Sequence, residues 1–250
     1  MMARFDSKVA FVTGAASGIG RATALRLGSE GASVACVDLA EEAAGKTALE
    51  IAEAGGRAVG LGCDVSDAQS VDAAVSSVVS ELGRISVVCN IAGIGSFAHT
   101  TEATVEHWSK IIDVNLTGTF LVCRTCLPYL LDGGGVIVNT ASTAGLMGQP
   151  YSAAYCASKG GVVMLTKALA VEYIKRGVRV VAIAPGGVDT PIINSFALPD
   201  DADYKLVAKI MSPMGVAKPE DLASLFAYVA SDEAHYMTGS IVTMDGGLTI

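Results

Sequence analysis

Short apolar runs alternate with amphipathic segments along most of this chain. The runs are rich in β-branched and aromatic side chains, and they predict buried strands at 9–13, 33–37, 58–62, 85–89, 135–140, 178–183 and 240–244. The segments between them carry apolar residues at helical spacing, and they predict helices at 19–29, 41–54, 68–82, 105–131 and 152–176. Because strands and helices alternate, the pattern predicts an α/β fold in which helices cover both faces of a parallel sheet.

Length and composition fit one large domain that spans residues 1–250. The chain has 250 residues and 51% hydrophobic side chains, which is enough for an ample core. A net charge of -8, from 17 Lys+Arg against 25 Asp+Glu, disfavours nucleic acid and anionic membranes as partners. The N-terminal apolar run is too short for a secretory signal, and no stretch holds about 18 uninterrupted apolar residues. We therefore expect a cytoplasmic protein with no membrane partner.

The cysteines and histidines predict neither a disulfide framework nor a metal site. The six cysteines lie mostly in apolar runs and are interpreted as small buried hydrophobes. Cys123 and Cys126 form a CxxC motif, but no second ligand pair follows at zinc-like spacing. With three histidines and no HExxH motif, the prediction is that no metal is bound.

The first strand runs directly into a glycine-rich turn and a helix start. Backbone N–H groups at such a helix N-terminus attract a pyrophosphate, and glycines let it approach closely. The predicted cofactor contacts in this loop are Gly14, Ser17, Gly18, Ile19 and Gly20. The spacing is GxxxGxG rather than GxGxxG, so a turn that merely packs a helix on the sheet is the alternative.

Acidic residues follow the second and third strands. Asp38 is placed to accept hydrogen bonds from the adenosine ribose and to repel a 2′-phosphate. Leu39 follows it in place of a basic residue, and together they predict NAD rather than NADP. Asp64 could meet the adenine amino group, with Val65 against the ring. Alternatively, Asp38 and Asp64 could each cap the helix that follows.

Four further polar residues are candidates for chemistry. Asn115 lies in a strongly apolar helix, where an unpaired amide would cost about 1–3 kcal/mol, so it indicates a hydrogen-bond network. Ser142 follows a strand. Tyr155 and Lys159 stand four residues apart on one helix face, and an ammonium there favours phenolate, drawing the tyrosine pKa from about 10 toward neutrality.

These motifs together resemble the classical short-chain dehydrogenase/reductase family. The resemblance rests on TGxxxGxG at 13–20, Asn90-x-Ala-Gly93, Asn115, Ser142 and Tyr155-x-x-x-Lys159, in this order. It implies a Rossmann-type doubly wound parallel sheet that binds NAD.

The family pattern also implies a role for each polar residue. Ser142 would bond the substrate oxygen, and Tyr155 would exchange the hydroxyl proton while hydride passes between the carbon and nicotinamide. Lys159 would hold the nicotinamide ribose and lower the pKa of Tyr155. Asn115 would anchor a water that connects Lys159 to solvent.

Three further expectations follow from the resemblance. The turn after the sixth strand would meet the nicotinamide carboxamide through Pro185, Gly186, Val188 and Thr190. Asn90 would contact the cofactor, although Ile91 replaces the second Asn of the usual family motif. The protein would be a homotetramer that buries the helices holding Asn115 and Tyr155.

Residues 191–215 break the strand-helix rhythm and resemble the family's substrate lid. The apolar residues available to cover a substrate are Ile192, Ile193, Phe196, Leu198 and Met211. A surface helical hairpin is the alternative. The other residues expected to line the substrate pocket are Phe97, His99, Ala144, Leu146, Met147, Gln149 and Tyr151.

The sequence thus predicts an NAD-dependent oxidoreductase that interconverts an apolar, cyclic or aliphatic secondary alcohol and its ketone. One alternative is a 3-oxoacyl carrier-protein reductase, which usually takes NADPH and needs a basic docking face. A second is a non-catalytic NAD-binding protein, which would have no need of all four polar residues.

Overall fold

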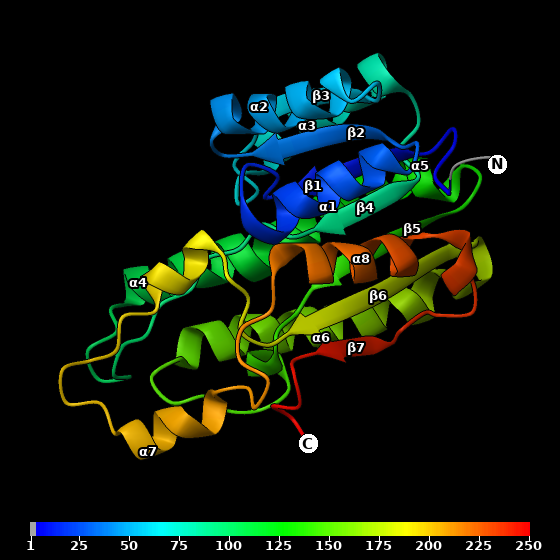
Figure 1. Ribbon diagram of the computed structural model, residues 1–250. Helices are drawn as coiled ribbons and strands as arrows, with labels where there is room; N and C mark the ends of the chain where they lie inside the picture. The colour runs from blue at the N-terminus through cyan, green and yellow to red at the C-terminus, as the bar shows by residue number, and fades with distance from the viewer. Residues whose placement is uncertain (1–3) are drawn as a thin grey trace.

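The computed structural model describes residues 4–250, which form one seven-stranded sheet with helices on both faces (Figure 1). The strands are β1 (Val9–Thr13), β2 (Ser33–Asp38), β3 (Arg57–Gly62), β4 (Val87–Asn90), β5 (Gly135–Thr140), β6 (Val178–Pro185) and β7 (Ile241–Met244). The helices are α1 (Gly18–Ser29), α2 (Glu41–Glu53), α3 (Ala68–Leu82), α4 (Val105–Ile112), α5 (Gly118–Leu131), α6 (Ala153–Tyr173), α7 (Tyr204–Val207) and α8 (Pro219–Ala230). The predicted Rossmann-type parallel fold is confirmed, with shifts of one to three residues at fewer than half of the predicted element ends.

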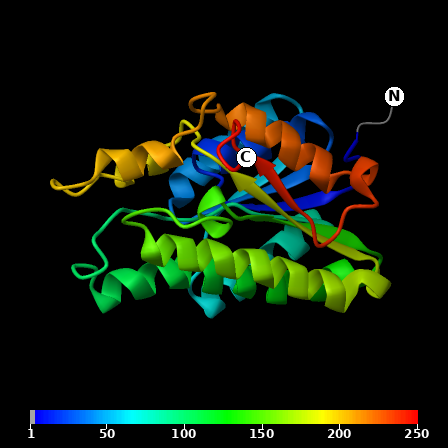
Figure 2. The ribbon, with the colours of Figure 1, turned by 90° about the horizontal axis from the view of Figure 1, so that it is seen from below.

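All strand pairs are parallel, in the order β3-β2-β1-β4-β5-β6-β7. The order reverses between β1 and β4, and in such sheets the carboxyl ends at this reversal open a crevice for a ligand. Figure 2 shows the two helix layers, with α5 and α6 below the sheet and α8 above it.

Each face of the sheet carries its own apolar core. On one face, Leu27 of α1 and Phe226 of α8 are fully buried with side chains of α2. On the other, Phe11 and Ile137 pack under α3 and α5. Because both faces are covered, the strands are apolar almost throughout, which is why their runs were readable in the sequence.

The helix predicted at 105–131 is interrupted. Between α4 and α5 the turn Asp113–Thr117 is π-helical, and Asn115 lies in it. The Thr119 hydroxyl donates to the Asn115 carbonyl at 2.7 Å in this widened turn. π-Bulges inside α-helices often occur at functional sites. Val105–Leu131 is long and apolar enough to span a membrane, but half of its most apolar window is buried inside the protein, as in a core helix.

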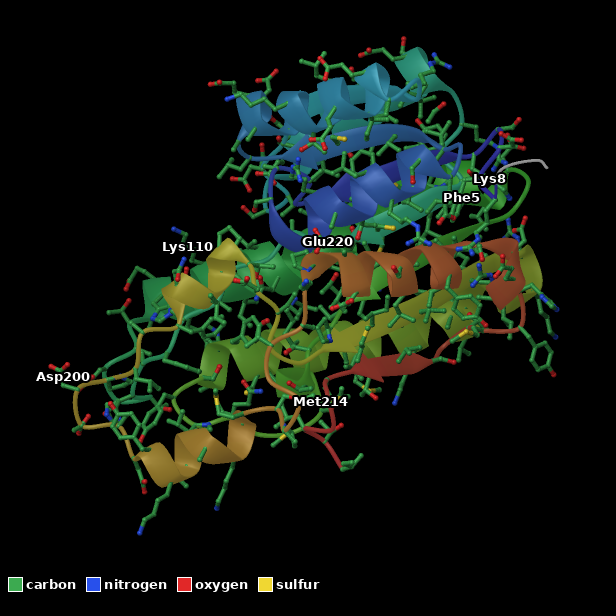
Figure 3. All side chains as sticks on the ribbon, viewed as in Figure 1. Phe5, Lys8, Lys110, Asp200, Met214 and Glu220 are labelled. Carbon is green, nitrogen blue, oxygen red and sulfur yellow. The ribbon has the colours of Figure 1, made fainter. Side chains whose placement is uncertain are left out.

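The segment between β6 and α8 projects beyond the carboxyl edge of the sheet. It contains a 3-10 turn, Pro191–Ser195, and the short helix α7. Figure 3 places Asp200 at its outer end and Met214 where it returns to the body of the protein. The lid predicted at 191–215 falls on this segment, and its role in covering a substrate stays a prediction.

Candidate active site

A cleft of about 1170 Å³ opens at the carboxyl edge of the sheet and beneath the lid. The glycine loop, the ends of β2, β5 and β6, the start of α6 and the lid all contribute to its lining. Sixteen of the eighteen residues predicted to act on substrate or cofactor line this cleft. Asn115 lies against it beside Gly93, and Asn90 is the exception.

The glycine loop has the shape of an anion cradle. Gly14 and Gly18 have φ values of +71° and +51°, which favour glycine. A Cβ on Gly20 would lie 2.0 Å from the Gly14 carbonyl oxygen, so the helix start and the loop touch backbone to backbone. The Ser17 hydroxyl caps none of the described backbone N–H groups, which leaves the first turn of α1 facing the cleft.

Asp38 ties the end of β2 to this loop. Its carboxylate accepts hydrogen bonds from the backbone N–H groups of Ala16 and Ala40, each at 3.0 Å. The alternative in which Asp38 caps α2 is wrong, because the N-cap residue of that helix is Ala40 and no described side chain bonds the N–H groups of its first turn. Two carboxylate oxygens offer about four acceptor positions. Asp38 can hold both N–H groups and still present acceptors to the cleft, which it lines with Leu39.

Asp64 and Val65 line the cleft beyond β3. The Asp64 carboxylate accepts from the N–H and hydroxyl of Ser66, at 2.9 and 2.6 Å. Asp67, and not Asp64, caps α3 through the N–H groups of its first turn. The capping alternative for Asp64 is therefore wrong.

The Asn90 side chain points away from the cleft, so the cofactor contact predicted for Asn90 or its backbone is left to the backbone and stays a prediction. The Asn90 amide is buried and donates to the Asn139 side-chain oxygen at 2.9 Å, and its carbonyl accepts from the Thr140 hydroxyl at 2.6 Å. Successive strand residues point to opposite faces, and Asn90 faces the core. The residues after it, Ile91 to Gly93, line the cleft instead.

Ser142, Tyr155 and Lys159 meet at the end of β5. The buried Ser142 oxygen accepts from the Ala144 N–H at 3.1 Å, and its hydroxyl bonds the Tyr155 oxygen. The Lys159 ammonium lies 5.7 Å from the centre of the Tyr155 ring and donates to the Thr140 carbonyl at 2.8 Å. The spacing in the sequence thus corresponds to a real cluster of side chains.

The expected lowering of the tyrosine pKa is not produced by the protein alone. Burial raises the pKa of Tyr155 to about 12, against the opposing effect of the Ser142 hydrogen bond. Burial also lowers the pKa of Lys159 to about 8. Both shifts arise because the cleft removes water from the charged forms. At Tyr155 desolvation is the largest effect on the pKa, and Lys159 is not among the groups that lower it, which corrects the expectation from the sequence.

Asn115 joins three segments of the site. Its side-chain oxygen accepts from the Ile94 N–H, and its amide donates to the Ile94 carbonyl, each at 2.8 Å. The amide also donates to the Ser158 hydroxyl at 3.0 Å, and that hydroxyl donates to the Tyr155 carbonyl at 2.8 Å. The predicted network exists, and it clamps the loop after β4 to the helix that carries Tyr155 and Lys159.

Three positioning residues did not emerge as such from the sequence. The Thr140 carbonyl holds Lys159, and Ser158 links Asn115 to α6. The buried Thr13 hydroxyl accepts from the N–H groups of Ile91 and Ala92, at 2.9 and 3.1 Å. The sequence held a signal for two of them. Ser158 immediately precedes Lys159, and Thr140 is the last residue of the strand that leads to Ser142.

The turn after β6 lies against the glycine loop. Pro185, Gly186, Val188 and Thr190 all line the cleft. A Cβ on Gly18 would lie 2.8 Å from the Thr190 methyl group, so the two loops touch. The structure therefore brings the predicted nicotinamide turn to the predicted pyrophosphate loop.

The lid closes the other end of the cleft. All five apolar lid residues predicted from the sequence line it, together with Phe97 and Gln149. His99, Ala144, Leu146, Met147 and Tyr151 lie outside the lining, which corrects their assignment. Ala144 is buried beneath a 3-10 turn, whereas Leu146 is 41% exposed to solvent.

His99 and Tyr151 instead hold the lid from outside the cleft. His99 Nε2 lies 2.7 Å from a carboxylate oxygen of Asp201, and the Tyr151 hydroxyl accepts from the Asp203 N–H at 2.8 Å. The hydrogen bond with Asp201 raises the pKa of His99. These contacts fix the middle of the lid to the loops beside the site.

The cysteines offer no reactive thiol near this site. Five are buried and Cys156 is half-buried. Burial raises the pKa of Cys123 to about 12 and raises the pKa of Cys126 well above its usual value. Among residues 4–250, no three His, Cys, Asp or Glu side chains gather as metal ligands.

Known proteins resemble this chain along almost its whole length. A family model described as enoyl-(acyl carrier protein) reductase matches residues 14–249. A 3β-hydroxysteroid dehydrogenase of Eggerthella lenta is 42% identical over 97% of this chain and 94% of its own length. A cyclohexanol dehydrogenase of an Acinetobacter species is 40% identical, with 100% and 98% covered.

Solved structures agree. A 3-ketoacyl-(acyl-carrier-protein) reductase from Brucella melitensis, complexed with NADH, superposes with a TM-score of 0.90 at 36% identity, over 98% of this chain and 100% of that one. The chain belongs to the short-chain dehydrogenase/reductase family, and it is an oxidoreductase that acts on CH–OH groups.

Proposed function

We propose that this protein transfers hydride between an apolar secondary alcohol and NAD, using Tyr155 as the proton donor and acceptor. The observation that carries the proposal is the cluster at the end of β5, where Ser142 bonds the Tyr155 oxygen and Lys159 lies beside the ring. Bound NAD supplies the hydride acceptor, and its positive nicotinamide ring adds a charge that favours phenolate.

The direction of proton transfer follows from the charge on Tyr155. With its pKa raised to about 12, Tyr155 is protonated at neutral pH and can donate to a ketone oxygen. In the oxidation direction it accepts the alcohol proton only as phenolate. The Ser142 hydroxyl and the Lys159 ammonium are the groups of this chain placed to stabilise that phenolate. Ser142 would also hold the substrate oxygen, and Asn115 would keep Lys159 connected to solvent through a water.

Cofactor choice is proposed to rest on Asp38. Its carboxylate lines the cleft beside the glycine loop, and Leu39 offers no countercharge for a 2′-phosphate. Like charges placed together in a binding site cost several kcal/mol, and each 1.4 kcal/mol is tenfold in affinity. NADP should therefore be the poorer cofactor by about 100-fold.

Asp38→Asn tests this part of the function. We expect wild-type protein to oxidise cyclohexanol with NAD about 100-fold more efficiently than with NADP, measured as the ratio of kcat/KM values. The variant removes the charge but keeps an acceptor, so the ratio should fall about tenfold or more. Asp64→Asn is the matched control, because it neutralises a carboxylate of the same cleft away from the ribose. Equal use of both cofactors by wild type, or a larger shift in the control, would contradict the assignment.

The carrier-protein reductase alternative receives less support. The lid beside the cleft carries Asp200, Asp201 and Asp203, and an acidic carrier protein would be repelled there. A non-catalytic role would leave the joined Ser142, Tyr155 and Lys159 cluster without a purpose.

A homotetramer and a cytoplasmic location remain predictions. The homotetramer gains support from large apolar side chains exposed on the helices expected to be buried in it. Phe120 on α5 is 44% exposed, and Met164 and Val171 on α6 are 61% and 78% exposed. Large apolar side chains exposed on these two helices are the feature expected of an interface between subunits.

A further inference from the structure

We infer that Phe196 forms an aromatic wall that makes the site selective for secondary alcohols whose carbinol carbon belongs to a saturated hydrocarbon ring. This inference rests on the proposed function and specifies its substrate class. The first observation is the position of the Phe196 ring, which reaches from the lid to the catalytic tyrosine. Its centre lies 5.3 Å from that of Tyr155, at 79° between the planes, and 4.9 Å from that of Phe97, at 64°.

Both contacts have edge-to-face geometry, which aromatic pairs prefer. Phe97 comes from the loop after β4 and Tyr155 from α6, so Phe196 joins the lid to two separate parts of the site. The ring is half-buried and lines the cleft. One side chain therefore both holds the lid closed and shapes the space beside the reacting hydroxyl.

Gly95 provides the seat for this ring. A Cβ at Gly95 would lie 2.3 Å from the Phe196 Cζ atom and 2.9 Å from the Tyr155 Cδ2 atom. Gly95 is buried, and its φ lies outside the positive range that favours glycine. The backbone conformation at Gly95 would therefore allow a side chain. A side chain is excluded because Phe196 and Tyr155 already fill the space that it would occupy.

The chemistry of the lid defines the substrate. Every lid residue from 191 to 211 that lines the cleft is apolar: Pro191, Ile192, Ile193, Phe196, Leu198, Val207, Ile210 and Met211. Gln149, a polar side chain that lines the cleft ahead of the catalytic helix, already donates to the Thr143 hydroxyl at 3.3 Å. A second hydroxyl on the substrate would give up its hydrogen bonds to water when it packs against these apolar side chains. If it found no partner there, the cost would be about 1–3 kcal/mol of binding free energy.

A saturated ring fits the same wall. Its C–H groups can pack against the Phe196 and Phe97 rings while one oxygen reaches Ser142 and Tyr155. An acyclic polyol cannot bury its carbon chain there without burying its other hydroxyls. The geometry therefore favours an alicyclic alcohol over a polyol of similar size.

The test compares cyclohexanol with 2,3-butanediol, each with NAD, in wild type, Phe196→Ala and Leu206→Ala. Leu206 is the matched control, because it is an apolar lid residue that is 41% exposed and outside the cleft lining. We expect wild type to prefer cyclohexanol at least tenfold in kcat/KM. Phe196→Ala should lower kcat/KM for cyclohexanol about tenfold or more, mainly by raising KM. The same variant should change kcat/KM for 2,3-butanediol less than threefold. Leu206→Ala should change neither, and the Kd for NADH should stay constant in all three proteins.

Gly95→Ala gives a second, independent variant. The added methyl group must displace the Phe196 ring, whose Cζ atom is its nearest neighbour, so it should shift selectivity in the same direction as Phe196→Ala. Because the methyl group also presses on the Tyr155 ring, kcat should fall for both substrates, and the ratio of their kcat/KM values is the readout. When Gly95→Ala is combined with Phe196→Ala, it should change the selectivity between the two alcohols by less than half of the amount that it changes it alone. Equal loss for both substrates in Phe196→Ala, or an equal effect of Leu206→Ala, would overturn the inference while leaving the proposed function intact. Failure of wild type to oxidise either alcohol with NAD would overturn the proposed function itself.

Discussion

Tyr155→Phe should lower kcat for alcohol oxidation by roughly 10²–10⁴-fold, the usual contribution of a positioned proton donor or acceptor. The substitution removes only the hydroxyl. The ring keeps its edge-to-face contact with Phe196, and Ser142 keeps its hydrogen bond from the Ala144 N–H. Folding and cofactor binding should therefore be preserved. Steady-state kinetics with cyclohexanol and a fluorescence titration with NADH measure the two properties separately.

Tyr151→Phe is the control for this variant. The Tyr151 hydroxyl accepts from the Asp203 N–H on the lid, outside the cleft lining, so its loss should alter KM modestly and leave kcat within a few-fold. A kcat for Tyr155→Phe close to that of wild type would exclude the proton-transfer role. A collapse of NADH binding in that variant would show that Tyr155 acts chiefly in cofactor binding.

Asn115→Leu should have the second largest effect, on both stability and activity. Leucine has the same branched outline as asparagine and a somewhat larger volume, but it leaves the Ile94 N–H and carbonyl and the Ser158 hydroxyl without this partner. Each buried group left unpaired costs about 1–3 kcal/mol. A loss of about 3–6 kcal/mol is large against the usual 5–15 kcal/mol of total stability. Urea unfolding measures the free energy, and kcat is measured well below the melting temperature.

Asn139→Leu separates the two effects. Asn139 is equally buried, and its amide bonds Asn90 and Thr166 in the core rather than at the cleft. The Asn139→Leu variant should lose about as much free energy of unfolding as Asn115→Leu. The folded protein should nevertheless keep the kcat of wild type. The variant at Asn115 should lose kcat as well, because the loop after β4 is released from the helix of Tyr155 and Lys159. Retained kcat in Asn115→Leu, or equal losses of kcat in both, would contradict a positioning role.

The fold was predictable because each of its signals is local. A parallel sheet covered on both faces makes strands such as 9–13 and 178–183 apolar almost throughout. Within the glycine loop, Gly14 and Gly18 have positive φ values, and Gly20 packs against the Gly14 carbonyl. The spacing of Tyr155 and Lys159 fixes their common helix face for the same reason.

What could not be predicted depends on contacts between distant segments. The Asn90 side chain turns into the core because Asn139, from a different strand, is its partner there. Tyr151 and His99 were expected in the pocket, but their partners on the lid draw them outside it. The pKa of Tyr155 was misjudged because sequence spacing reports a neighbouring charge and not the burial of the group.

The position of Phe196 illustrates the same limit. Its apolar character and its place in the lid were evident from the sequence, and it does line the cleft. Its seat over Gly95 involves residues about 100 positions away, and only the folded structure shows why Gly95 is a glycine.

The central claim is that a secondary alcohol gives its carbinol hydrogen to NAD at the cleft formed by the glycine loop, Tyr155 and the lid. The most direct measurement supplies wild-type protein with NAD and cyclohexanol deuterated at the carbinol carbon, and follows the label by mass spectrometry. We predict equal amounts of cyclohexanone and of NADH that carries the deuterium. Label that stays in the alcohol without NADH formation, or that appears in water, would contradict direct hydride transfer and the function proposed for this site.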